Sequence, residues 1–155
     1  RGPAVTEEDF RRMLQKIRQQ FDFCLLDAPA GLGRGFQLAT CAADRCVVVT
    51  TADASSLRDA QHTVMELDRF PSGALHLVVN RVRKKLLRQL HATIDDAIDK
   101  AGLPLLGVVP EDDALPLCLN RGIPVPLAGS QLSAAAYRNI ARRIQGERVP
   151  LLRIR

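Results

Sequence analysis

The sequence has 155 residues, of which 46% are hydrophobic and 25% are charged, so it can bury a core and is not typical of a disordered chain. The formal net charge is +5, but the chain has one tyrosine, five phenylalanines and no tryptophan. So few aromatic residues argue against a stacking platform, and no specific nucleic acid partner is expected. No apolar run approaches the roughly 20 residues of a membrane-spanning helix, and the four cysteines form no C-x-x-C pair, so a cytoplasmic protein is expected.

The first predicted elements are a helix and a buried strand. Thr6 offers an N-cap to a helix whose apolar residues recur at helical spacing between Phe10 and Ile17. The short apolar run Phe23–Leu26 lacks alternation, which is typical of a parallel strand covered on both faces. This strand is expected to deliver Asp27 to the rim of the sheet, where ligands bind in open α/β folds.

Two kinds of ligand site compete for this strand end. A dinucleotide fingerprint has the spacing G-x-G-x-x-G, whereas Gly31, Gly33 and Gly35 alternate here. An apolar strand that ends on an aspartate matches the Walker-B arrangement, in which the acid holds Mg²⁺ directly or through water. The alternative without a ligand is that Asp27 caps the following turn.

The chain then alternates between helices and strands. Residues 36–43 predict a short helix, and 46–50 predict a β-branched buried strand. A helix follows, which Ser55 or Ser56 would cap. Another strand is predicted over 75–79, with Asn80 at its tip, where an amide can read a purine edge or simply close a turn.

The remaining elements complete this pattern. We predict a helix over 87–101, a strand over 105–109 and a final helix capped by Ser130. Pro116 predicts a short or distorted turn between the last two elements. Strands that alternate with helices, without an internal repeat, predict an α/β fold with a parallel sheet and flanking helices.

Several phrases of the sequence resemble the MinD family of septum-site-determining ATPases, which belongs to the deviant-Walker ParA/MinD superfamily. These phrases are Leu25–Phe36, Val47–Asp59, Val79–Val82, Gly107–Asp112 and Asn120–Val125, in that order. No glycine-rich loop ending in Gly-Lys-Ser/Thr occurs, so the family's phosphate cradle is absent from these residues. The resemblance implies a partial P-loop NTPase-like fold without the P-loop strand: residues 1–148 would be the C-terminal part of one ATPase domain, and 149–155 a tail.

The resemblance also implies site residues for ATP and Mg²⁺. Asp27 would bind Mg²⁺, with Ala30 and Gly31 in the loop that senses the γ-phosphate. The base of ATP would be bound by residues at two strand ends, namely Asn80, Arg81, Pro110, Glu111 and Asp112. The surface for the dimer and the partner inhibitor would include Ser56, Arg58 and Asp59.

The implied function is ATP-dependent regulation of division-septum placement by a homodimer on the inner face of the cell membrane. Its partners would be a MinC-like inhibitor and a MinE-like topological regulator, and membrane contact would use a tail not present here. Because the phosphate cradle is missing, this segment alone is expected to hydrolyse no ATP. The alternatives are a nucleotide-free interaction or regulatory domain of the same fold, and a related ParA-type or flagellar-number ATPase.

Overall fold

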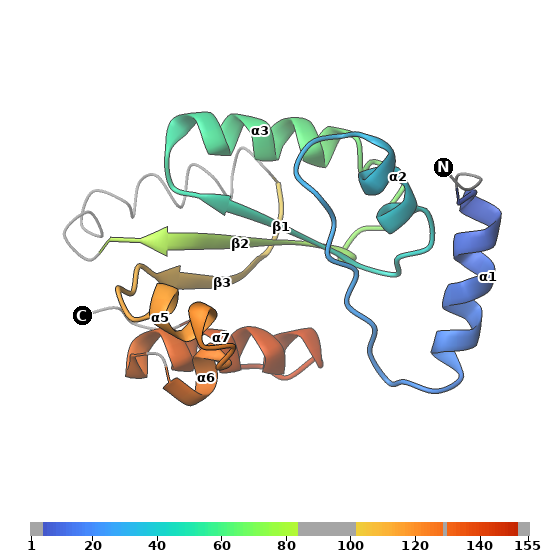
Figure 1. Ribbon diagram of the computed structural model, residues 1–155. Helices are drawn as coiled ribbons and strands as arrows, with labels where there is room; N and C mark the ends of the chain where they lie inside the picture. The colour runs from blue at the N-terminus through green and yellow to red at the C-terminus, as the bar shows by residue number, and fades with distance from the viewer. Residues whose placement is uncertain (1–4, 84–101, 129, 152–155) are drawn as a thin grey trace. The chain divides into compact units, whose positions relative to one another are not determined.

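The computed structural model describes residues 5–83, 102–128 and 130–151. The chain forms two compact units, Arg1–Cys46 and Val47–Arg155 (Figure 1). The helix predicted over 87–101 lies outside the described residues.

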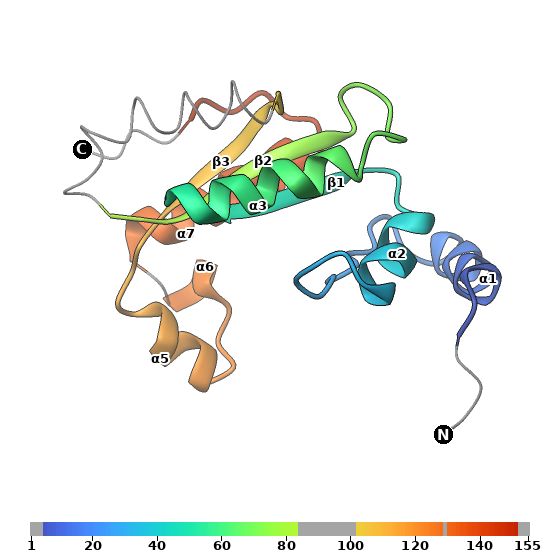
Figure 2. The same ribbon diagram turned by 90° about the horizontal axis from the view of Figure 1, so that it is seen from above.

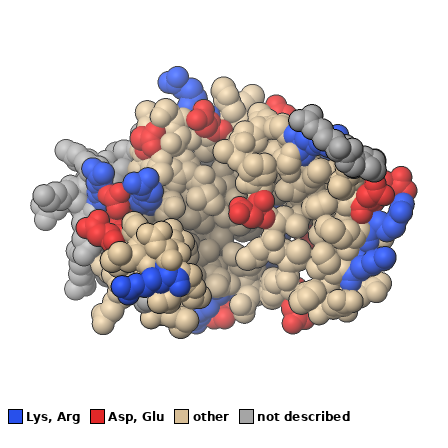
Figure 3. Space-filling model, viewed as in Figure 1, with Lys and Arg blue, Asp and Glu red and all other residues tan. Residues whose placement is uncertain are grey.

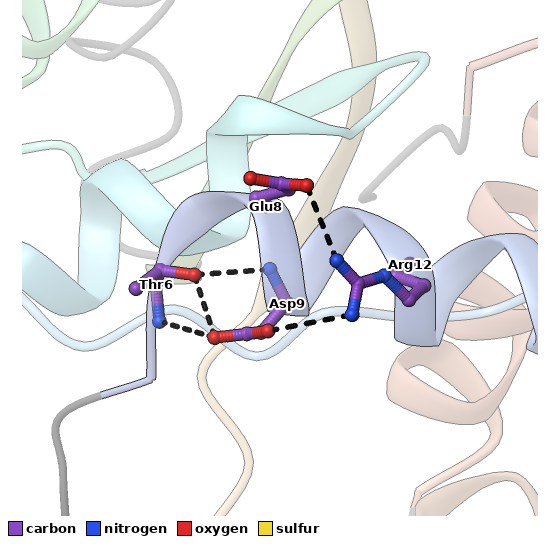
Figure 4. Close-up of polar contacts among 4 residues, drawn as sticks. All are labelled: Thr6, Glu8, Asp9 and Arg12. Atoms are coloured by element: carbon purple, nitrogen blue, oxygen red, sulfur yellow. Dashed lines mark hydrogen bonds and ion pairs between the residues drawn. The ribbon is translucent and has the colours of Figure 1, made fainter.

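The first unit begins with helix α1, Glu7–Arg18, whose start is defined by a capping box (Figure 4). The Thr6 hydroxyl oxygen accepts a hydrogen bond from the Asp9 amide at 3.1 Å, and the Thr6 amide donates to the Asp9 carboxylate at 3.3 Å. Arg12 donates to Glu8 one turn earlier at 3.1 Å. These local bonds satisfy amide groups that a helix start otherwise leaves unpaired, and they confirm the predicted N-cap.

Helix α2, Arg34–Cys41, is the other helix of this unit. It starts and ends two residues before the predicted helix, because Gly33 is its N-cap. Arg18 at the end of α1 pairs with Asp44, and Arg34 donates to the carbonyl of Val5. The two helices are therefore joined by exposed polar contacts from both ends of the α1 segment.

The strand predicted over 23–26 is wrong for this structure. The segment has no regular secondary structure, and Phe21, Phe23 and Leu25 are 62%, 60% and 84% exposed. An apolar run becomes a buried strand only when a neighbouring strand pairs with its backbone and other elements cover its faces. Within the described part of the unit Arg1–Cys46, only Cys46, the first residue of β1, has strand structure. The turn that follows is present, with Gly31 at a φ of +85°.

The second unit is built on a sheet of strands β1 (Cys46–Thr51), β2 (Leu75–Val82) and β3 (Leu105–Pro110), in that spatial order. All three arrows run the same way in Figure 1, and β2 pairs with β3 in parallel. Helix α3, Ala54–Met65, covers one face and α7, Gln131–Ile144, covers the other (Figures 1 and 2). The predicted α/β class and parallel sheet are confirmed.

The core of this unit lies on both faces of β2 and β3. Successive side chains of a strand point to opposite faces, so Leu77 and Val79, at most 1% exposed, lie on the face opposite to Val78. A cluster of the buried residues Val78, Leu106, Val109 and Ala136 joins the sheet to α7, with Tyr137, Ile140 and Ile144 packed against it. Each such aliphatic side chain contributes about 1.5–3 kcal/mol by leaving water.

Gly107 and Arg143 bring β3 and α7 close together. A Cβ atom on Gly107 would lie 2.4 Å from Cγ1 of Ile140, so only glycine fits beneath the helix. The Arg143 guanidinium donates to the carbonyl of Leu106 in β3, and its Nε and Nη2 donate to the carbonyl of Val149 at 2.9 and 2.6 Å. Arg143 therefore fastens the segment after α7 to the sheet.

Two short helices, α5 (Leu115–Asn120) and α6 (Val125–Ala128), precede α7. Pro116 lies in the first turn of α5, where its missing amide hydrogen is tolerated, and the helix is short as predicted. Ser130 caps α7 as predicted. The cap of α3 is Asp53 rather than Ser55 or Ser56, because the Asp53 carboxylate accepts the Ser56 amide hydrogen at 2.9 Å. Among the described helices, none combines the length and apolarity that crossing a bilayer would require.

Candidate functional site

The carboxyl end of β2 carries an unusual backbone turn at Asn80 and Arg81. β2 runs to Val82, so both residues lie within the strand and not after it as predicted. Arg81 has a φ of +56°, the one positive value of a residue other than glycine in the described chain. The Asn80 side-chain oxygen accepts the Arg81 amide hydrogen at 2.9 Å. The half-buried Asn80 therefore supports this turn through its oxygen, and its amide nitrogen makes no hydrogen bond to the described chain.

Glu111, directly after β3, joins the ends of β2 and β3. Its amide donates to the carbonyl of Val82 at 2.9 Å, while its carboxylate accepts from Arg81 Nη2 at 3.2 Å and from Arg83 Nε at 2.6 Å. Arg83, then Arg81, holds the pKa of Glu111 below its usual range. In Figure 3 basic and acidic side chains gather over the carboxyl ends of β2 and β3, at the left of the view. Two guanidinium groups therefore share the carboxylate of Glu111.

Asp112 points instead to the start of α7. One carboxylate oxygen accepts the Ala114 amide hydrogen at 3.0 Å, and the other accepts from the Ser130 amide at 2.8 Å and from the Ser133 hydroxyl. The Ser133 hydroxyl and then these two amides hold the pKa of Asp112 far below its ordinary value, against the opposing effect of burial. Ser133 itself is completely buried. We call this set of four residues the Asp112 clasp.

The structure thus brings the predicted base-site residues together at the carboxyl ends of two neighbouring strands. Pro110 pairs in register with Val82 and is fully buried at the end of β3. Ligands of parallel α/β sheets bind outside these ends, so the arrangement is suited to a small polar ligand. The residues that sequence analysis missed are Arg83 and Ser133. Arg83 lies in a dense basic run that was visible, but Ser133 stands among alanines without any signal of its own.

The three residues predicted to lie near phosphate belong to the first unit. Asp27, Ala30 and Gly31 are all exposed, and they precede α2. Across the described ranges, no group of three or more His, Cys, Asp or Glu side chains is placed to hold a metal ion. The assignment of Asp27 to Mg²⁺ therefore stays a prediction.

The predicted partner-surface residues lie in the first turns of α3. Ser56 takes part in the cap, where its hydroxyl lies 2.8 Å from the Thr51 hydroxyl. Hydrogen bonds, first from the Ser55 hydroxyl and then from Thr51 and Ser56, hold the pKa of Asp53 far below its ordinary value. Arg58 and Asp59 are exposed. Exposure is what a contact surface requires, but the role of all three remains a prediction.

A three-layer arrangement with a parallel sheet and polar groups at its carboxyl rim defines the class as a P-loop NTPase-like α/β protein. Residues 4–143 match the profile of a family described as "Cellulose biosynthesis protein BcsQ". The chain belongs to this ParA/MinD-like family, and its resemblance to MinD proteins is confirmed by the relatives below.

The septum site-determining protein MinD of Bacillus subtilis (strain 168) is 38% identical over 150 residues, covering 96% of this chain and 56% of that protein. The MinD cell division protein of Aquifex aeolicus has a TM-score of 0.88 at 29% identity, covering 97% of this chain and 65% of that one. The MinC:MinD complex from the same organism gives 0.86 at 28%, covering 96% and 63%. The chain thus spans little more than half the length of the B. subtilis relative.

Proposed function

We propose that this chain is the C-terminal part of an ATP-binding and ATP-hydrolysing regulator of division-septum placement. The observation that carries the proposal is the similarity to septum-site-determining proteins over 96% of the chain, with the strand-end residues inside that stretch. Residues 1–148 would belong to one ATPase domain, and 149–155 to a tail.

The base of ATP would bind at the rim formed by Asn80, Arg81, Pro110 and Glu111. The fit rests on chemistry seen there: Asn80 accepts from the Arg81 amide and has a donor nitrogen to offer, which suits a ring nitrogen of a purine. The two guanidinium groups at Glu111 would offer hydrogen-bond donors to a polyanionic ligand.

The phosphates of ATP do not fit this chain by itself. Its 155 residues contain no Gly-Lys-Ser/Thr loop, so nothing in them supplies a backbone cradle for the phosphates. Asp27 is an exposed carboxylate of the kind that holds Mg²⁺ together with water and phosphate oxygens, and Ala30 and Gly31 would accompany it. We therefore assign no hydrolytic step to this segment, which would be inactive alone.

The assembled protein would act as an ATP-dependent homodimer on the inner face of the cell membrane. An inhibitor related to the MinC of the Aquifex complex would bind it, and a MinE-like regulator would control it. The surface of α3 around Ser56, Arg58 and Asp59 is proposed for the dimer and inhibitor contacts, because two of these residues are exposed beside the Asp53 cap.

The test is calorimetry with Mg-ATP on the 155-residue chain and on the same chain extended by the upstream residues of its parent gene. We expect measurable binding only in the extended protein, and Asn80→Ala should weaken it by about 1–3 kcal/mol because the polar edge of the base loses its partner. Asn120→Ala, at the exposed end of α5, is the matched control. An extended protein that binds neither ATP nor ADP would contradict the proposal and favour a nucleotide-free regulatory domain.

A second candidate process follows from the description of the matching family, which names cellulose biosynthesis. Both processes are compatible with one ATPase fold, since fold does not determine function. A strain without the parent gene distinguishes them: misplaced septa with normal cellulose output support the septum role, and the converse supports cellulose biosynthesis.

A further inference from the structure

The two acidic residues that follow β3 face opposite partners. Glu111 is held by Arg81 and Arg83 of the β2 end, and Asp112 by Ser130 and Ser133 of the α7 start. Because they are adjacent in the chain, the peptide between them is fixed from both sides. This places Asp112 behind the rim that Glu111 forms.

The half-buried carboxylate of Asp112 is occupied by hydrogen bonds within the protein. Both of its carboxylate oxygens accept hydrogen bonds, at 3.0 Å from the Ala114 amide and 2.8 Å from the Ser130 amide, and the Ser133 hydroxyl adds a further bond. Ser133 is completely buried, so the hydroxyl end of this bond has no water molecule to replace Asp112. The next residue, Asp113, is exposed, which provides a natural comparison.

We propose that Asp112 is a positioning residue for the nucleotide-base site: by clasping Ser130 and Ser133 at the start of α7, it fixes Glu111 against Arg81. This inference rests on the proposed function and replaces the expectation that Asp112 binds the base directly. An acceptor that already holds three donors has little left to offer a ligand.

The coupling runs through contacts described above. Loosening Asp112 releases the peptide of Glu111, whose amide donates to Val82 at 2.9 Å and whose carboxylate holds Arg81. Arg81 adopts its positive φ with help from the Asn80 oxygen at 2.9 Å. Asn80 would then lose the orientation in which its amide nitrogen meets a base, although Asp112 contacts neither Asn80 nor the base.

The first test needs no nucleotide. Amide hydrogen exchange is compared in the 155-residue chain, in Ser133→Ala, and in Asp113→Asn as a control that removes a charge from the neighbouring exposed position. Ser133→Ala should speed exchange of the Arg81 and Glu111 amides about tenfold, with Leu77 and Val79 in the core of β2 unchanged. Unchanged exchange at Arg81 and Glu111 overturns the inference, as does a uniform increase throughout β2.

The second test measures Mg-ATP and Mg-GTP affinity in the extended protein. Ser133→Ala and Asp112→Asn should each weaken ATP binding about tenfold and reduce the preference for ATP over GTP, whereas Asp113→Asn keeps both. Glu111→Gln combined with Ser133→Ala should weaken ATP binding by less than the sum of the two single effects, because both changes act through the contact between Glu111 and Arg81. A lowered melting temperature with an unchanged ATP-to-GTP ratio makes Asp112 purely structural and overturns the inference. If the unaltered protein binds neither nucleotide, the proposed function fails and with it the base-site role of Asp112. The exchange result still decides whether Asp112 positions Glu111 against Arg81.

Discussion

Two apolar stretches of this chain, Phe21–Leu26 and Leu75–Asn80, have similar composition but different structures. The second is the buried centre of a sheet, with Leu77 and Val79 at most 1% exposed. The first has no strand structure, and its Leu25 is 84% exposed. The difference lies in their neighbours, since β2 lies between β1 and β3 whereas no strand pairs with the first stretch in the described chain. A strand is thus a property of a pairing and not of an apolar run alone.

The sharpest way to measure this difference is thiol reactivity. Cys24 is exposed, whereas Cys41 and Cys118 are buried. We expect Cys24 to react with a disulfide reagent on the order of 10³-fold faster, because a buried thiol reacts only when its surroundings open. Variants that keep one of these three cysteines and lack the other three of the chain's four assign the rates. In the extended protein, Cys24 should become slow if a restored strand pairs with its segment, and an unchanged fast rate would contradict that pairing.

Leucine truncation in each stretch tests the same comparison by stability. Leu77→Ala should lower the free energy of unfolding by about 2–5 kcal/mol, because it removes completely buried atoms and leaves a cavity. The matched change Leu25→Ala should alter it by less than about 0.5 kcal/mol, since that side chain already faces water. Urea unfolding followed by circular dichroism gives both values. Equal losses would mean that the first stretch is buried in solution.

Local structure in the first unit is expected to depend on its caps. Thr6→Ala removes the hydroxyl that accepts the Asp9 amide hydrogen at 3.1 Å and should destabilise α1 by about 1 kcal/mol. The measurement is the loss of helical circular dichroism, with Thr6→Ser as the control that keeps the hydroxyl. If Thr6→Ser loses as much as Thr6→Ala, then the methyl group and not the cap is responsible.

The smallest expected effect is the dependence of the second unit's stability on pH. The pKa of Asp112 is lower in the folded chain than in the unfolded one, so its contribution to stability is present above about pH 4 and is lost as the pH falls through the folded value. Ser133→Ala removes the main cause of this shift. The difference in the free energy of unfolding between the unaltered chain and Ser133→Ala, measured by urea unfolding, should therefore be largest near pH 7 and shrink below pH 4. A difference that is independent of pH would assign the effect to packing.

The elements that sequence analysis predicted correctly are those with local signals. Thr6 and Ser130 precede apolar residues at helical spacing, and both are caps; the run at 75–79 lies in a strand. Asp53 was missed as a cap because three hydroxyl-bearing neighbours and one acid all qualify, and only the backbone geometry selects among them. The failure at 23–26 and the role of Ser133 share one cause, since both depend on partners remote in the sequence.

Helix α7 is held to the rest of the second unit at both of its ends, and Arg143 makes the contact at its last turn. Helix α7 starts at the Asp112 clasp beside the carboxyl ends of the strands and finishes where Arg143 holds Leu106, near the amino end of β3. The same guanidinium donates to the carbonyl of Val149 at 2.6 Å, so one side chain ties together helix α7, strand β3 and the segment after α7.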